Sequence, residues 1–116
     1  MVLIYALLAF ALLGPPPATA QQKRVIPIVA ERFSFVPSQI KVKAGTVVEF
    51  RIHSEDTNHG FRIPAAGINE VIPKRGKGEL KVTFHAEKPG RYEFECSKPC
   101  GAGHNMMRGV IVVEPE

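Results

Sequence analysis

Val48-Glu49-Phe50-Arg51-Ile52-His53 alternates strictly between apolar and polar side chains. A period of two puts the apolar side chains on one face of an extended strand, so this segment predicts a half-buried β-strand. Segments 80–85 and 92–95 repeat the pattern. Shorter apolar segments predict further strands, at 25–30, 40–43, 61–63 and 110–113. Since no window shows a sustained helical period, the chain is predicted to be all-β.

Turn-forming residues separate the expected strands. Proline, glycine and small polar residues cluster between the strands, at 36–38, 44–45, 64–67, 73–78 and 88–90. Many short strands at this spacing predict a β-sandwich of two antiparallel sheets. The chain has 116 residues, of which 45% are hydrophobic and 22% charged, so it can hold one ordinary globular domain. This length leaves no room for a separate catalytic domain.

The first twenty residues have the composition of an export signal. Residues 2–13 form an unbroken apolar run that is too short to span a bilayer, which needs about 20 residues. Ala18-Thr19-Ala20 then offers the small-residue pattern that signal peptidases cut. We therefore predict a signal peptide over 1–20 and a domain over 21–116, periplasmic or otherwise exported and without a stable membrane span. No Lys or Arg precedes the apolar run, and an uncleaved anchor is the alternative.

The balance of charge excludes few partners. Fifteen Lys and Arg against eleven Asp and Glu give a formal net charge of +4. Export argues against nucleic acid as a partner. The short basic segment Lys74-Arg75-Gly76-Lys77 contains no aromatic residue and is predicted to be a solvated loop.

Soft metal ligands are concentrated in Cys96-Ser-Lys-Pro-Cys100-Gly-Ala-Gly-His104-Asn-Met-Met107. Thiolate, imidazole and thioether together favour copper, whereas a hard cation prefers carboxylates and a structural zinc ion usually takes four Cys or His ligands. Cys96 continues the alternation of segment 92–94, so its sulfur is expected to point inward. Taken alone, the two cysteines favour the disulfide of an exported protein over a metal site.

The spacing Cys-x3-Cys-x3-His-x2-Met, with a second histidine far upstream, resembles the CuA domain of cytochrome c oxidase subunit II and of nitrous oxide reductase. The upstream segment Ser54-Glu-Asp56-Thr-Asn-His59-Gly-Phe61-Arg-Ile-Pro64 also looks like that family. Segments 33–37, 40–45 and 90–92 are similar to cupredoxin strands and turns. The resemblance implies a cupredoxin-like Greek-key β-sandwich over nearly all of the predicted domain.

The resemblance also implies a binuclear copper centre. Its two copper ions would be held by two bridging thiolates, one neutral imidazole for each ion and two weak ligands, namely Cys96 and Cys100, His59 and His104, and the Met107 thioether with the Lys98 backbone carbonyl. The implied function is electron transfer in a respiratory chain, with a cytochrome c-type donor and a terminal oxidase or reductase as acceptor. No catalytic activity of its own is expected; the chain would be the electron-entry subunit of a cytochrome c oxidase-type complex.

Three features depart from subunit II. Lys98 stands where that family usually has Glu or Gln, the chain has no Trp, and its net charge is positive. A positive surface favours an acidic partner.

Other interpretations of the same residues stay open. A mononuclear blue-copper site would use His59, one cysteine, His104 and Met107, whereas a Cu(I) storage or delivery module would use the two thiolates. A disulfide-stapled adhesion domain without metal is a further alternative. Among the remaining residues, Met106 is expected to be a packing residue and Asp56 to cap a turn or hydrogen-bond near the site. His53 and His85 are expected to be solvated.

Overall fold

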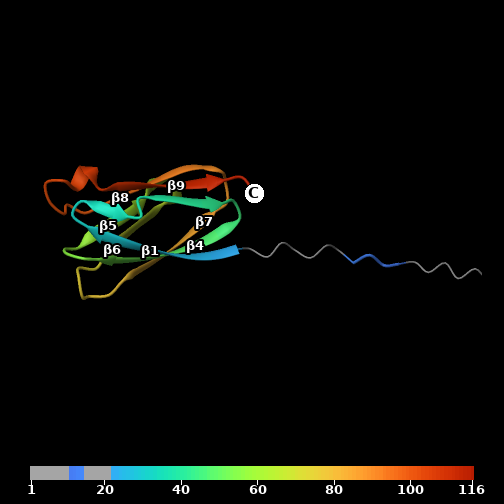
Figure 1. Cartoon of the computed structure of the whole chain (residues 1–116), viewed down its shortest axis with the longest axis horizontal. Helices are drawn as coiled ribbons and strands as arrows, with labels where there is room; N and C mark the ends of the chain where they lie inside the picture. The colour runs from blue at the N-terminus through green and yellow to red at the C-terminus, as the bar shows by residue number, and fades with distance from the viewer. Residues whose placement is uncertain (1–10, 15–21) are drawn as a thin grey trace, which may run out of the picture.

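The computed structural model describes residues 11–14 and 22–116, and the second of these segments forms a β-sandwich (Figure 1). Its strands, in chain order, are β1 (Gln22–Glu31), β2 (Ser34–Val36), β3 (Gln39–Lys43), β4 (Thr46–Ser54), β5 (His59–Ile63), β6 (Ile68–Ile72), β7 (Leu80–Ala86), β8 (Gly90–Glu95) and β9 (Arg108–Glu114). Two single-turn 3-10 helices, η1 (Pro64–Ala66) and η2 (His104–Met106), complete the described elements. The all-β prediction is confirmed.

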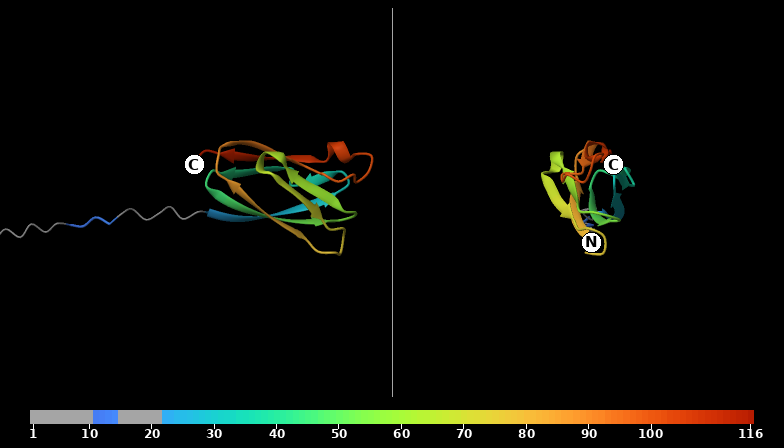
Figure 2. Two further views of the ribbon diagram at one scale, coloured as in Figure 1. Left: turned by 180° about the vertical axis from the view of Figure 1, so that it is seen from behind. Right: turned by 90° about the vertical axis from the view of Figure 1, so that its left-hand side faces the viewer.

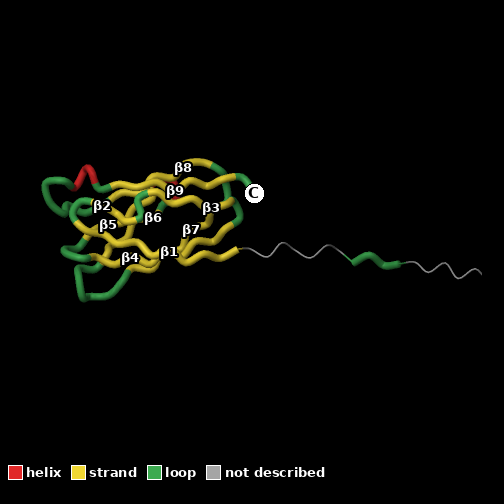
Figure 3. The backbone as a smooth tube through the Cα atoms, viewed as in Figure 1, coloured by secondary structure: helices red, strands yellow, loops and turns green. Residues whose placement is uncertain are grey.

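Two sheets make up the sandwich. One sheet has the strand order β2-β1-β4-β7, and the other has the order β3-β9-β8-β5-β6 (Figure 3). Figure 2 shows the same arrangement from behind and from the end that carries segment 96–107. Within the described part of the chain, neither short helix has the length and hydropathy that a membrane crossing requires.

The prediction that both sheets are antiparallel is wrong, because each sheet contains one parallel pair. β1 runs parallel to β4 over nine residue pairs, and β3 runs parallel to β9 over five. After β2 the chain changes sheets to form β3, and it changes back to form β4 beside β1. Alternating polarity determines which face of a strand is buried but not the direction of its neighbour, so the sequence pattern could not predict these pairs.

The polarity pattern did not predict two strands, β2 and β6, although segment 33–37, which contains β2, resembles cupredoxin strands and turns. Both lie at the edge of a sheet, β2 has only three residues, and three consecutive residues of β6 are exposed. A strand of three residues, or one with three exposed residues in a row, lacks the clear two-residue period on which the prediction depended. The predicted strands at 25–30, 40–43, 61–63 and 110–113 all fall within observed strands.

Four phenylalanine rings join the two sheets directly beneath the candidate site. Phe61 lies between Phe50 and Phe94, with ring centroids 5.8 and 5.3 Å away, and Phe35 lies 5.3 Å from Phe94. All four side chains are fully buried or nearly so. A Cβ atom at Gly109 would lie 2.6 Å from the Ser38 carbonyl oxygen, so glycine is needed where β9 passes over this cluster.

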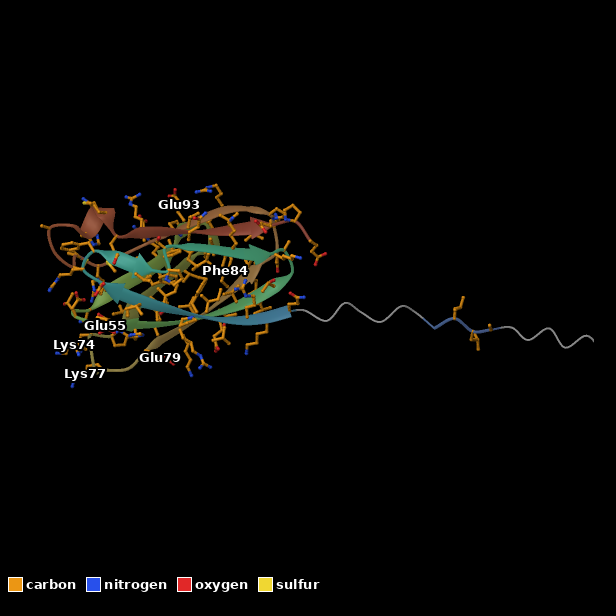
Figure 4. All side chains as sticks on the ribbon, in the orientation of Figure 1. Glu55, Lys74, Lys77, Glu79, Phe84 and Glu93 are labelled. Atoms are coloured by element: carbon orange, nitrogen blue, oxygen red, sulfur yellow. The ribbon has the colours of Figure 1, made fainter. Side chains whose placement is uncertain are left out.

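The loops at one end of the sandwich carry the predicted chemistry. Segment 96–107, orange to red in Figure 1, lies at the end opposite the C-terminus. Lys74 and Lys77 project from another loop at this same end (Figure 4) and are exposed, as predicted. The predicted signal peptide 1–20 lies outside the described residues except for 11–14, so the structure does not test it.

Candidate metal centre

Three neighbouring strands bring the predicted ligands together. His59 is the first residue of β5, Cys96 directly follows β8, and Met107 directly precedes β9. Since β5, β8 and β9 lie side by side in one sheet, these side chains start from adjacent positions at one sheet end. The Cys96 backbone N–H donates to the Met107 carbonyl oxygen at 3.0 Å, which closes the loop between β8 and β9.

The two cysteines are free and lie side by side. Their Sγ atoms are 3.6 Å apart, and both side chains are buried, with 4% exposure each. The inward orientation predicted for Cys96 is confirmed. The structure therefore contains two adjacent thiols rather than the disulfide that was considered from the sequence.

Each sulfur has one imidazole nitrogen next to it. His59 Nδ1 lies 3.9 Å from Cys96 Sγ, and His104 Nδ1 lies 3.6 Å from Cys100 Sγ. The donor atoms of His59, Cys96 and Cys100 all lie within 4.8 Å of one another. The sequence-predicted residues thus form two sulfur–nitrogen pairs that meet at the cysteines.

Each sulfur also has one weak donor within reach. The Met107 Sδ atom lies 3.9 Å from Cys100 Sγ, and the Lys98 carbonyl oxygen lies 3.1 Å from Cys96 Sγ. Although Pro99 restricts the backbone of Lys98, it leaves this carbonyl directed at the site. All six predicted donor groups are therefore brought to one place.

Burial divides the site into an interior part and a surface part. His59 and Met107 are fully buried, whereas His104 is only half-buried on η2. Met106 is 79% exposed, so its predicted role as a packing residue is wrong. The 3-10 turn over His104–Met106 explains why Met106 is exposed while His104 is half-buried, because side chains on such a turn point in different directions.

Asp56 fixes the ring of His59. Its Oδ1 atom lies 2.6 Å from His59 Nε2 and also accepts the Thr57 N–H at 2.8 Å, while its Oδ2 atom accepts the Arg32 N–H at 2.9 Å. Partial burial raises the pKa of Asp56, but the hydrogen bonds from Arg32, His59 and Thr57 outweigh burial and hold this pKa below its usual value. An ionised carboxylate only accepts, so His59 Nε2 carries the proton and Nδ1 is left free to face Cys96.

The surroundings of Cys100 keep its thiol protonated when no metal is bound. Burial, together with the neighbouring Cys96, raises the pKa of Cys100 to about 11, while the positive charge of Arg32 acts in the opposite direction. A metal ion binds the thiolate, so binding at this site has to displace a proton.

Gly60 lets the ligand loop approach β5. Its N–H donates to Cys96 Sγ at 3.4 Å, and a Cβ atom here would lie 2.7 Å from the Ser97 nitrogen and 2.8 Å from the Lys98 nitrogen. Any larger residue would therefore push the loop away from His59. The sequence analysis did not single out Gly60, and only its position next to His59 could have suggested a role.

Comparison with known proteins places this chain in a family. The cupredoxin-like domain matches residues 3–113. Cytochrome c oxidase subunit 2 of Thermus thermophilus is 36% identical over 98 residues, which are 83% of this chain and 70% of that protein. The chain belongs to the cupredoxin family and is related to cytochrome c oxidase subunit 2.

Solved structures agree with the cupredoxin assignment. A heme-copper terminal oxidase dimer contains a chain that matches with a TM-score of 0.70 and 32% identity, covering 81% of this chain and 65% of that one. The metal-binding domain of the Cu(I)-exporting P-type ATPase CopA from Streptococcus pneumoniae matches with a TM-score of 0.63 and 25% identity. The match covers 84% of this chain and 91% of that domain. The periplasmic domain of oxidase subunit II (CoxB) from Bradyrhizobium japonicum shares the fold, with a TM-score of 0.70 and 18% identity. The match covers 79% of this chain and 84% of that domain.

This cupredoxin matches only part of several relatives. It spans 56% of a second subunit 2 sequence from Thermus thermophilus and 34% of the subunit 2 of Myxine glutinosa. The comparison with these relatives therefore concerns the cupredoxin-like domain and not their whole length.

The donor set of this cupredoxin fits copper. Two thiols, two imidazoles and a thioether are soft or intermediate ligands, and the carboxylate of Asp56 is already engaged by His59 and by backbone N–H groups. Four of the donor side chains are buried or nearly so, which would exclude water from a bound metal.

Proposed function

We propose that this domain binds copper in a binuclear, CuA-type centre and transfers electrons. The observation that carries the proposal is the pairing of donors around two adjacent thiols, each with its own imidazole nitrogen and its own weak donor. A mononuclear blue-copper site would use both imidazoles and the thioether but only one of the two thiols, so it would leave the second thiol and the Lys98 carbonyl without a role. The relation to oxidase subunit 2 supports the same function.

The proposed ligands repeat the expectation from the sequence. The two thiolates would bridge both metal ions, the two imidazoles would bind one ion each, and two weak donors would complete the centre, namely Cys96 and Cys100, His59 and His104, and Met107 with the Lys98 carbonyl. Bridging thiolates allow a single electron to be shared by two copper ions, which is the chemistry that such a centre supplies.

The protein contributes a fixed frame for these donors. Asp56 holds the His59 ring in one orientation, and the bond between the Cys96 N–H and the Met107 carbonyl holds the ends of the loop together. Ligands that are held this way move little when the oxidation state changes, and a small rearrangement is what fast electron transfer needs.

We place the domain, over 21–116, outside the cytoplasmic membrane, after a signal peptide over 1–20. The relatives named as oxidase subunit 2 and the match to a heme-copper oxidase chain support a cytochrome c-type donor and a terminal oxidase or reductase as acceptor. His104 is half-buried at the loop end of the sandwich, so this end offers the shortest path between the centre and a docked partner.

Copper analysis of the purified, reconstituted domain tests the proposal. We expect two copper ions per chain, and we expect Cys96→Ser and Cys100→Ser each to abolish the native visible spectrum, because both thiolates would be needed to hold the copper pair. A single ion per chain, with one of the two variants keeping its colour, would instead indicate a mononuclear blue-copper site.

A second candidate is a domain that binds and delivers Cu(I). The similarity to the metal-binding domain of a Cu(I)-exporting ATPase favours it, as do the two free thiols. Rapid transfer of Cu(I) to a competing chelator, without stable Cu(II) colour, would support delivery. Retention of copper through repeated oxidation and reduction would support electron transfer.

A further inference from the structure

Arg32 joins the two loops that carry the proposed ligands. It lies in the turn between β1 and β2, and its backbone N–H donates to Asp56 Oδ2 at 2.9 Å. Its side-chain Nε donates to the Cys100 carbonyl oxygen at 2.8 Å, across 68 residues of sequence. One residue therefore contacts both the carboxylate that orients His59 and the backbone of a proposed bridging ligand.

The same turn packs against the ligand loop through Phe33. A Cβ atom at Gly101 would lie 2.8 Å from the Phe33 ring, and a Cβ atom at Gly103 would lie even closer to this ring. Gly101 also has a φ of +139°, which L side chains rarely adopt. The loop is thus shaped to fit over the turn, and this contact keeps the Arg32 guanidinium in front of the Cys100 carbonyl.

We propose that Arg32 is a positioning residue of the metal centre, which holds the Cys100 segment in place and adds a positive charge next to it. This inference rests on the proposed copper-binding function. A guanidinium group that donates to a carbonyl makes a charge-assisted hydrogen bond, which is stronger than a neutral one. A fixed cation close to the centre also favours its reduced, less positive state.

The contact allows a selective variant. Arg32→Met removes the guanidinium but keeps an unbranched side chain, and the backbone N–H bond to Asp56 remains. Arg24→Met is the matched control, because Arg24 Nη1 also donates to a backbone carbonyl, that of Lys41, at 2.9 Å. Arg24 lies in β1, eight residues before Arg32 and therefore about 26 Å along an extended strand.

Amide hydrogen exchange of the metal-free protein is the first readout. The amides of Cys96, His104 and Met107 each donate within loop 96–107. We expect them to exchange about tenfold faster in Arg32→Met, as the loss of one charge-assisted hydrogen bond would produce, while the amides of β4 keep their rates. The proposal would be overturned if the loop amides exchanged at the same rates in Arg32→Met as in Arg24→Met. It would also be overturned if Arg32→Met accelerated the loop amides and the β4 amides equally.

The copper-loaded protein gives the second readout. We expect Arg32→Met to release copper to a chelator about tenfold faster and to have a lower midpoint potential, and we expect Arg32→Lys to restore the potential because it keeps the charge. Unchanged release and an unchanged potential in Arg32→Met would overturn the positioning role. Failure of the wild-type protein to bind copper would refute the proposed function instead, and the exchange experiment would still decide whether Arg32 holds the loop.

Discussion

Asp56 links the turn between β1 and β2 to the loop that carries His59. It accepts from the backbone of Arg32 and of Thr57, and it holds the buried ring of His59. Its carboxylate charge decides which nitrogen of His59 carries the proton. A residue that binds no metal in our proposal therefore determines whether a proposed ligand can act.

Replacement of Asp56 by Asn tests this role. The amide keeps the shape of the side chain but not its charge, so it no longer requires His59 Nε2 to carry the proton. We expect Asp56→Asn to hold copper about tenfold more weakly in a chelator competition. Glu55→Gln is the control, since Glu55 is exposed and pairs with His53 instead; equal affinities for both variants would contradict the role given to Asp56.

Lys98 tests how charge at the site affects the reduction potential. Its carbonyl faces Cys96 while the residue is exposed, so Lys98→Glu changes the charge and leaves the carbonyl in place. We expect a lower midpoint potential, by on the order of 40 mV for each charge unit if one unit contributes about 1 kcal/mol. Lys43→Glu is the control, because Lys43 lies at the opposite end of the sandwich, and this variant should leave the midpoint potential unchanged. A midpoint potential that does not fall in Lys98→Glu would contradict the expectation.

At the scale of single residues, the sequence predicted best those site residues that lie close together in the chain. The proposed ligands from Cys96 to Met107 fall within one short segment, and the resemblance to the CuA domain added His59 from a distant segment. Arg32 and Gly60 were not predicted, because they reach that segment across 68 and 36 residues and, unlike His59, are not metal-ligating residue types that a motif would single out. Such contacts depend on strand pairing, which residue spacing does not report.

Strands β5 and β8 connect the core to the site. Phe61 lies two residues after His59 on β5, and Phe94 lies two residues before Cys96 at the end of β8. Residues two apart in a strand share a face, so the face that packs the aromatic cluster also presents the donors. The stability of this cluster and the geometry of the site are therefore linked.

Phe61→Ala tests that link at the level of the element. Phe61 is fully buried and touches rings from both sheets, so we expect the free energy of unfolding to fall by about 3–5 kcal/mol in a denaturant titration. Val71→Ala on β6 is the control, because Val71 is 49% exposed and its truncation should cost less than about 1 kcal/mol. Similar losses in the two variants would show that the cluster is not central to stability.

Strand faces could be predicted from the sequence, but strand neighbours could not. The alternation in segments 48–53, 80–85 and 92–95 gave the buried faces of β4, β7 and β8, and the structure confirms them. The parallel pairing of β1 with β4 and of β3 with β9 arises from changes of sheet along the chain. Nothing in the polarity of a single segment encodes such a change.

At the scale of the whole molecule, one end of the sandwich gathers the donors, the Arg32 turn and the exposed loop with Lys74 and Lys77 (Figure 4). The two sheets hold this end together through a continuous buried core. The resulting unit has the two properties that a one-electron carrier needs, namely donors in fixed positions and a half-buried ligand, His104, at the surface.

The hyperfine structure in the electron paramagnetic resonance spectrum of the copper-loaded protein tests the central claim most directly. A binuclear centre built on the adjacent Cys96 and Cys100 thiolates predicts one unpaired electron shared equally by two copper nuclei. We expect the splitting pattern of two equivalent nuclei, together with two copper ions per chain. The splitting pattern of a single copper nucleus would contradict the account.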